Sequence, residues 1–158
     1  MGSVATVATI SLILHSLSAV VWVGGMIFAH FILRPAALPL EPPARLALWS
    51  RVLDRFFAWV IAAILLLLAS GYTIVFRVMG GFANAGLHVH LMQGTGIIMV
   101  LLFFHLYFAP WRRFRAALAR QDMAEAARQL GQIRTIVTIN LVLGVLTVAI
   151  GSSGRYWG

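Results

Sequence analysis

The chain has 158 residues, of which 61% are hydrophobic and 10% are charged, and it carries a formal net charge of +8. Soluble domains average about 45–50% apolar and about 25% charged residues, so this composition excludes a soluble globular protein and predicts one small integral membrane domain over residues 1–158. The chain contains no cysteine and all 12 of its basic residues are arginine, which excludes disulfides, thiolate metal sites, cysteine nucleophiles and lysine chemistry.

Four apolar stretches are long enough to cross a bilayer, which requires about 20 apolar residues in a helix. The first has no basic segment before it and is much longer than the apolar core of a signal peptide, so we expect it to be retained as a span. It ends at "RPAALPLEPPAR", where prolines interrupt helical hydrogen bonding, and "MGGFANAG" forms a short turn later in the chain. The spans are expected at residues 5–33, 57–77, 87–109 and 133–152.

Residues 110–134 differ from the spans on either side because apolar and charged side chains are mixed there. Phe114, Leu118 and Leu130 fall roughly on one helical face, with arginine and glutamine elsewhere. This pattern predicts an amphipathic helix on the membrane surface between spans three and four. The expected fold is therefore all-α: a four-transmembrane-helix bundle with one amphipathic surface helix.

Arginine is concentrated in two of the connections between spans. Cytoplasmic loops carry an excess of basic residues, so both of these connections are expected in the cytoplasm and both termini outside, in the inner (cytoplasmic) membrane. The distribution favours contact with anionic head groups of the lipid bilayer over nucleic acid. The connection after span one holds Arg34, Arg45, Arg51 and Arg55, and that after span three holds Arg112, Arg113, Arg115, Arg120, Arg128 and Arg134, whereas the opposite side has Arg77 and Arg155.

All five histidines lie in spans one and three, where an ionisable side chain is costly and usually functional. His15 and His30 are separated by 15 residues, and a proline follows five residues later. His90 and His105 repeat this spacing 75 residues further along the chain. Fifteen residues correspond to about 22 Å along an α-helix and a rotation of about 60°, so both pairs can face one bundle interior at two matching depths.

Two facing histidines at each of two depths suit the axial ligation of two stacked haem groups in a helical bundle. Neutral imidazole bound to iron also avoids a charged histidine in lipid, and arginines near each level can pair with haem propionates. The candidate cofactor-binding residues are the iron ligands His15, His90, His30 and His105 and the propionate partners Arg34, Arg77 and Arg112, with Arg51, Arg55, Arg134 and Arg155 near the same levels.

Simpler interpretations of the histidines stay open at this point. One haem between His15 and His90 is one alternative, and the other is no haem, with each histidine hydrogen-bonded to a neighbouring helix. His88 lies near the outer interface and outside the pairing, and is expected to be hydrated. Met92 and Met99 lie about 200° from the face of His90, so they are expected to fill the core and not to bind copper.

Other residues of the spans have two alternative roles each. Trp22 packs either against a porphyrin or against a neighbouring helix. Asn140, isolated in span four, is expected to hydrogen-bond between helices. The glycines either admit a porphyrin face or let two helices approach closely; they are Gly94, Gly96, Gly144 and Gly151.

The stretch "LHSLSAVVWVGG" resembles the first span of the CopD and HemJ group of small membrane proteins, with His15, then Trp22, then Gly24–Gly25. The stretch "LHVHLMQGTGIIMVLLFFHLYFAPWRRF" is similar to the third span of HemJ-like proteins, with His105 before a loop rich in Trp and Arg. The resemblance to HemJ implies a protoporphyrinogen oxidase that binds haem b through the first-span histidine and a third-span lysine, a position taken here by His90. The resemblance to CopD implies copper uptake or resistance.

These observations together predict a membrane b-type cytochrome that binds two haem b groups and transfers electrons across the membrane, with a quinol or a redox protein as donor or acceptor. As an enzyme it would be an oxidoreductase linked to quinol or to porphyrinogen. The alternatives are a HemJ-like protoporphyrinogen oxidase with one haem and a CopD-like copper transport or resistance protein. A homodimer is compatible with so small a bundle.

Overall fold

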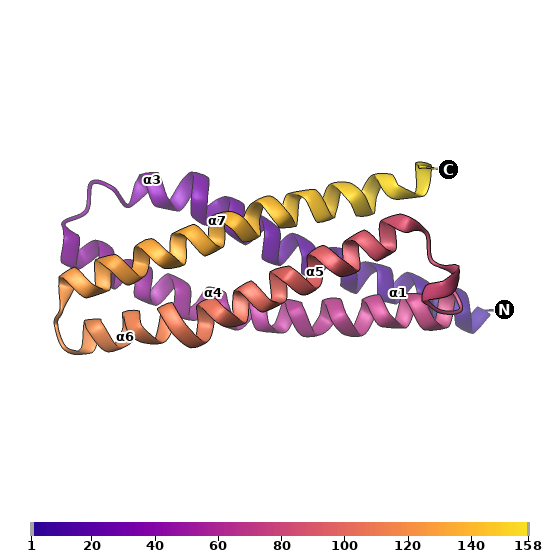
Figure 1. Ribbon diagram of the computed structural model, residues 1–158, viewed down its shortest axis with the longest axis horizontal. Coiled ribbons are helices and arrows are strands. Elements are labelled where there is room, and N and C mark those ends of the chain that lie inside the picture. Colours follow the sequence, from indigo (N-terminus) through magenta and orange to yellow (C-terminus); the bar gives the residue numbers. More distant parts are fainter. Residues whose placement is uncertain (1, 158) are drawn as a thin grey trace.

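The hydrocarbon core of a bilayer offers no hydrogen-bonding partner to the backbone, which restricts an apolar chain of this kind to helices whose bonds close within each span. The computed structural model describes residues 2–157, without the side chains of residues 2 and 155, and it is helical over most of that range (Figure 1). Four helices are long and apolar enough to cross a membrane, and each contains one of the four expected spans: Ser3–Ala36, Pro42–Val78, Leu87–Ala119 and Met123–Ser153, called spans one to four below.

Spans one to three combine α-helical segments with wider π-helical turns, whereas span four is a single α-helix. Two further segments, residues 82–84 and 154–156, are short 3₁₀ helices outside the spans. The segments are α1 (Gly2–Ala19), η1 (Val20–Gly24), α2 (Gly25–Ile27), η2 (Phe28–Leu33), α3 (Arg34–Ala36), α4 (Pro42–Thr73), η3 (Ile74–Val78), η4 (Phe82–Asn84), α5 (Leu87–Leu106), η5 (Tyr107–Trp111), α6 (Arg112–Ala119), α7 (Met123–Ser153) and η6 (Gly154–Tyr156).

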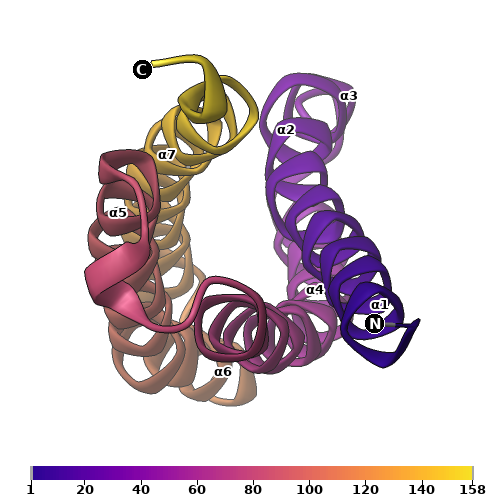
Figure 2. The same ribbon diagram turned by 90° about the vertical axis from the view of Figure 1, so that its right-hand side faces the viewer.

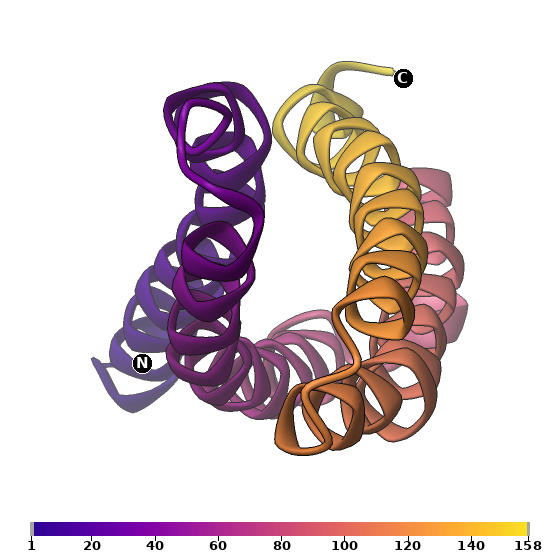
Figure 3. The same cartoon turned by 90° about the vertical axis from the view of Figure 1, so that its left-hand side faces the viewer.

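The four spans form an antiparallel bundle in which span one lies opposite span three. α1 packs on α4, and α5 and α6 pack on α7, while α2 also touches α7. Figures 2 and 3 view the bundle from its two ends and show span two between spans one and three, with span four closing the fourth side. Both termini lie at one end and the connections after α3 and α6 at the other, here called the arginine-rich end because residues 34–45 and 112–128 lie there (Figure 1).

Aromatic side chains join three spans in the bundle interior. The ring of Phe57 in span two lies 5.6 Å from that of Phe103 in span three and 5.2 Å from that of Trp111, both edge-on. Trp22 in span one, only 4% exposed, contacts Phe103 edge-on at 6.3 Å. Trp22 thus packs against a neighbouring helix, which is one of its two expected roles. Edge-to-face pairs of this kind contribute about 0.5–1.5 kcal/mol each beyond the area they bury.

The connection between spans three and four differs from the expected surface helix in its path. The amphipathic helix between these spans is present as α6, but it continues span three and packs on the first turns of α7 as an antiparallel pair. Phe114 is buried on α6, whereas Leu130, which was expected on the same helical face, is buried on α7; their exposures are 0% and 3%. The chain reverses at Gln121, whose φ is 57°, and the carboxylate of Asp122 then accepts a hydrogen bond from the Glu125 amide. Aspartate is a favoured N-cap residue, so the chain starts a second helix after this reversal in place of continuing one.

The matched prolines of spans one and three have a structural counterpart. η2 ends two residues before Pro35, and η5 contains Pro110. Proline cannot donate its backbone N–H and displaces the carbonyl four residues earlier, so a wider turn accommodates it. The two segments thus share a local geometry as well as a spacing, and both run towards the arginine-rich end (Figure 1).

Gly25 allows the close approach of spans one and two, and its neighbour Gly24 does not. A Cβ added at Gly25 would overlap the ring of Phe56, whereas one at Gly24 would meet nothing within 4 Å. We expect Gly25→Ala to destabilise the protein by about 1–3 kcal/mol, as overpacking in a core does. Gly24→Ala should be neutral or slightly stabilising, because alanine favours the helix over glycine. Thermal unfolding in detergent measures both, and equal effects of the two variants would contradict this account of the interface.

Candidate functional site

His15 lies on the inner side of span one, against span two. Its Nδ1 is 3.2 Å from the hydroxyl oxygen of Ser70, and that hydroxyl also bonds to the carbonyl of Leu66. Gly71 makes room for the imidazole, since a Cβ there would stand 3.1 Å from its Cε1. Ser70 is 5% exposed, so a buried hydroxyl and a glycine on α4 together orient the ring. This pair of neighbours is the kind of arrangement that holds a functional histidine in lipid.

His30 lies further along span one and faces span four. Its Nδ1 is 3.4 Å from the hydroxyl of Thr138 on α7, and its ring is edge-on to Phe31. His15 lies in α1 and His30 lies in the π-helical segment η2, with a second π-helical segment, η1, between them. Residues in wider turns no longer follow the 3.6-residue phase, which is why the two histidines contact different helices, α4 and α7, and do not share one direction.

His90 and His105 lie on the exposed face of span three. Both side chains are exposed, and the positions between them on the same helical face are exposed too, with Leu101 at 64% and Phe108, one turn beyond His105, at 60%. The buried residues of this helix, Met99, Phe103 and Leu106, lie on the opposite side. The ring of His90 stands 6.0 Å from that of Phe82.

The structure therefore brings together the histidines of span one with spans two and four, and it does not bring either of them against a histidine of span three. Within residues 2–157 there is also no group of three or more His, Asp or Glu side chains placed to hold a metal ion. The pairing of His15 with His90 and of His30 with His105 at iron stays a prediction, and in this arrangement it requires span three to turn or a second copy of the chain to supply the outward histidines.

The remaining histidine has a packing role at the end of the bundle. A Cβ added at Gly154 would overlap the side chain of His88, and one at Gly86 would stand 2.9 Å from its ring. His88 thus fills the space between the start of span three and the end of span four. The sequence signal for this contact is the glycine at each side, which the histidine spacing alone does not reveal.

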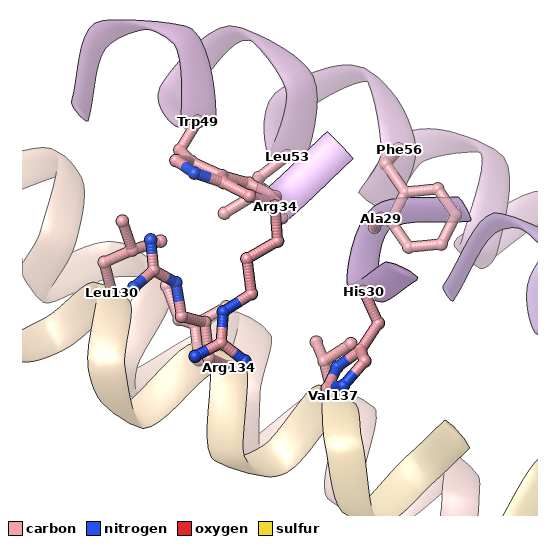
Figure 4. Close-up of a pocket in the computed structure, with 10 residues that line it drawn as sticks. Ala29, His30, Arg34, Trp49, Leu53, Phe56, Leu130, Arg134 and Val137 are labelled. Atoms are coloured by element: carbon pink, nitrogen blue, oxygen red, sulfur yellow. The ribbon is translucent and has the colours of Figure 1, made fainter. Parts of the chain in front are cut away.

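The candidate propionate arginines lie in three different settings. Arg34 lines a small pocket that also contains His30, and Arg134 of span four lines the same pocket (Figure 4). Arg112 is exposed and lines a separate surface groove of about 250 Å³ with Tyr107, Phe108, Trp111 and Arg115. Arg77 is exposed near the opposite end of the bundle, and the side chain of Arg155 lies outside the described residues. Of Arg34, Arg77 and Arg112, it is Arg34 that lines the pocket containing His30.

The pocket beside His30 contains a residue that the sequence analysis did not single out. Trp49 of α4 is 5% exposed, and its indole Nε1 has no hydrogen-bond partner. The guanidinium carbon of Arg134 lies 5.7 Å from the Trp49 ring centroid, a cation–π distance. A tryptophan in the charged lead-in "LWSRVLDRFF" is the only sequence signal for it.

Buried side chains of spans one, three and four meet in the middle of the bundle. A Cβ at Gly144 would stand 3.1 Å from the methyl of Met99 and 3.5 Å from that of Met26, both nearly fully buried. Asn140 donates to the Met99 carbonyl at 3.1 Å, which confirms its expected role as an interhelical hydrogen bond. Its Oδ1 is buried without a partner.

The glycines of span four accept methionine side chains, as expected for close helix packing. Gly151 lies against Met92, and Gly144 against Met99. Met92 and Met99 thus point at span four and away from the face of His90, as their spacing predicts. Gly94 and Gly96 in span three have nothing within 4 Å of an added Cβ.

The fold and this distribution of polar groups define an all-helical protein with four membrane-crossing helices and a small set of inward polar side chains. The family model of copper resistance protein D matches residues 50–153. The chain belongs to this CopD family. The matched segment covers most of span two and all of spans three and four, and therefore includes His90 and His105 but neither His15 nor His30.

A curated relative matches most of the chain. An uncharacterised protein of Aquifex aeolicus (strain VF5) is 29% identical over 141 residues, which cover 89% of this chain and 90% of that protein. No solved structure matches the chain significantly.

The outward position of His90 can be tested directly because the chain contains no cysteine. We expect His90→Cys to react with a small water-soluble maleimide faster than Val89→Cys, its neighbour at the same depth, because His90 is exposed and Val89 is half-buried. Labelling kinetics of the two single-cysteine proteins in detergent would decide. The reverse order would mean that His90 turns into the bundle.

Proposed function

We propose that this CopD-family protein is a membrane b-type cytochrome that binds haem b at the levels of His15 and His30 and transfers electrons across the bilayer. The observation that carries the proposal is the pocket in which the imidazole of His30 lies with the guanidinium groups of Arg34 and Arg134. An imidazole beside two guanidinium groups is a donor set that suits haem iron and its propionates. His15, oriented by Ser70, supplies the second level.

The donor groups of this pocket suit haem, but in this arrangement of the spans the pocket is far too small for a porphyrin. The pocket at His30 has a volume of about 30 Å³, which holds about one water molecule. Its walls are otherwise apolar and come from three different spans, so room for a porphyrin has to come from separation of spans one and four. His90 and His105 of span three would supply the second imidazole at the two levels.

When bound, haem supplies the reversible one-electron couple of its iron, and the protein supplies ligands, depth and dielectric. Ser70 fixes the ring of His15, and Thr138 contacts that of His30. Trp22 and Phe103 fill the interior between the two levels and exclude water from it. Low dielectric around an iron site raises the influence of each nearby charge, so Arg34 and Arg134 favour the reduced, more electron-rich state at the arginine-rich end.

The proposed orientation follows from arginine content. The arginine-rich end faces the cytoplasm and both termini face outside, in the inner membrane, by the positive-inside rule. The partners proposed for this arrangement are a quinol or a redox protein at either face. A homodimer is proposed as the state in which the outward histidines of span three would be covered.

The first test is a pyridine haemochrome assay on purified protein, normalised to protein concentration. We expect about two haem groups per chain, and loss of one of them in His15→Ala and in His30→Ala, because each removes an axial ligand. His88→Ala is the matched control, since His88 packs against Gly154 and holds no predicted ligand position. Folded protein without a Soret band would overturn the proposal.

The span-three variants separate the possible ligand sets. Loss of haem in His90→Ala and His105→Ala would establish paired ligation and imply a turn of span three or an intermolecular site. Full haem content in both, with loss in the span-one variants, would assign iron to span one and a ligand other than these histidines. One haem that depends on His15 and not on His30 would favour the porphyrinogen oxidase alternative.

Copper handling is the second candidate, and one observation favours it beyond the family description. The buried thioethers Met26 and Met99 converge at Gly144, with methyl groups 3.5 and 3.1 Å from the added Cβ position. Thioether sulfur is a soft ligand that selects Cu(I). In the CopD-like alternative, these two side chains bind copper within the bundle.

The copper alternative predicts a different purified protein. It should contain copper and show no haem absorption, and Met26→Leu combined with Met99→Leu should remove the metal while keeping the volume nearly constant. Met123→Leu, at an exposed position in the arginine-rich end, is the control. Elemental analysis of the three proteins decides, and copper content independent of Met26 and Met99 would reject this site.

A further inference from the structure

The pocket at the arginine-rich end has two kinds of wall. It opens between spans one, two and four, and much of its lining is apolar, including Leu53, Phe56 and Val137. Figure 4 shows Arg34 extending from span one towards span four, with Arg134 and Trp49 on the same side of the opening and His30 beside Val137. An apolar cavity with guanidinium groups on one side suits a molecule with an apolar body and an anionic end.

Two buried donors in this pocket have no acceptor. The Nε of Arg134 and the indole Nε1 of Trp49 are both shielded from solvent and both lack a hydrogen-bond partner. Trp49 is 95% buried, since its exposure is 5%. Buried polar groups are nearly always paired, so two unpaired donors lining one pocket indicate an acceptor that belongs there.

The charge of the pocket is also uncompensated by the chain. Arg34 and Arg134 line the same pocket, so two like charges lie close together there (Figure 4). In the part of the chain that the structure describes, the ion pairs join Arg115 to Asp54 and Arg128 to Glu125, away from this pocket. Like charges held close together in a partly apolar setting are favourable only when an anion lies among them.

We infer that this pocket binds the oxoanion, phosphate or carboxylate, of an amphiphile, through Arg34, Arg134 and the indole N–H of Trp49. The guanidinium forks hold the oxoanion and Trp49 donates a third hydrogen bond. Because the pocket has a volume of only about 30 Å³, it takes the anionic end alone, and the apolar body of the amphiphile extends from the pocket into the bilayer. Two sources carry this chemistry: an anionic phospholipid of the leaflet at this end, and a haem propionate. The propionate source rests on the proposed function, whereas the phosphate source does not.

The test titrates purified full-length protein in neutral detergent with short-chain phosphatidylglycerol and counts bound lipid by native mass spectrometry. Arg34→Gln combined with Arg134→Gln should weaken binding at least about tenfold, since two charge-assisted contacts are lost. Trp49→Phe should weaken it less, because it removes one donor and keeps most of the ring. Arg113→Gln combined with Arg120→Gln, at two exposed positions outside the pocket, should leave the affinity unchanged.

Two further measurements separate the sources. Diacylglycerol with the same chains, which lacks the phosphate, should bind as weakly to the wild-type protein as phosphatidylglycerol does to the double variant. If the propionate source is correct, the haem content of Arg34→Gln, Arg134→Gln falls and haem-loaded protein takes up no lipid. If the phosphate source is correct, haem content is unchanged and lipid affinity alone falls.

The outcomes keep this inference distinct from the cytochrome proposal. Protein that carries no haem but loses lipid affinity in the double variant supports the oxoanion site and rejects the cytochrome. Equal phosphatidylglycerol affinity and equal haem content in wild-type, pocket and control proteins overturn the site. Arg34→Gln alone, at an exposed side chain, and Trp49→Phe provide the same comparison if the double variant fails to fold.

Discussion

The packing of span three against its neighbours decides what its histidines can reach. Met99, Phe103 and Leu106 are the buried residues of α5. Met99 packs against Gly144 of α7, and Phe103 packs against Phe57 of α4. A helix buried along this line must turn the opposite face outward, and that face carries His90 and His105. A change in their direction would require Met99 and Phe103 to leave the core, which couples any ligation by span three to a rearrangement of the whole interface.

Hydropathy predicted the spans well, because crossing a bilayer requires a long apolar helix and such a helix can be recognised from sequence alone. Hydropathy does not predict which face of each helix turns towards the bundle interior. Lipid-facing and buried faces in a membrane are equally apolar, so the pattern of span three does not distinguish them. The expectation that four histidines share one interior assumed a regular α-helical phase. The π-helical turns of span one shift that phase, and the burial of Met99, Phe103 and Leu106 turns the histidine face of span three outward.

The sequence predicts the role of a residue correctly where the chemistry of its side chain alone determines that role. Asn140 is polar in an apolar helix and had to find a partner on another helix, and it did so at the Met99 carbonyl. Trp49 was missed because a tryptophan near a membrane interface is ordinary. Its importance arises from an unpaired indole nitrogen beside Arg134, which depends on how three spans meet.

The two functional hypotheses draw on different parts of the chain. The segment that matches the CopD family begins at residue 50, so it contains Met99 and Gly144 but excludes His15 and His30. Chemistry shared with that family through this segment therefore centres on spans two to four, whereas inward imidazole comes from span one. The two regions meet at several contacts. Met26 and Val23 of span one reach Gly144 of span four, His15 contacts Ser70 of span two, and His30 contacts Thr138 of span four. A ligand that used both regions would lie at one of these contacts, and the two that carry an imidazole are the two histidine levels of span one.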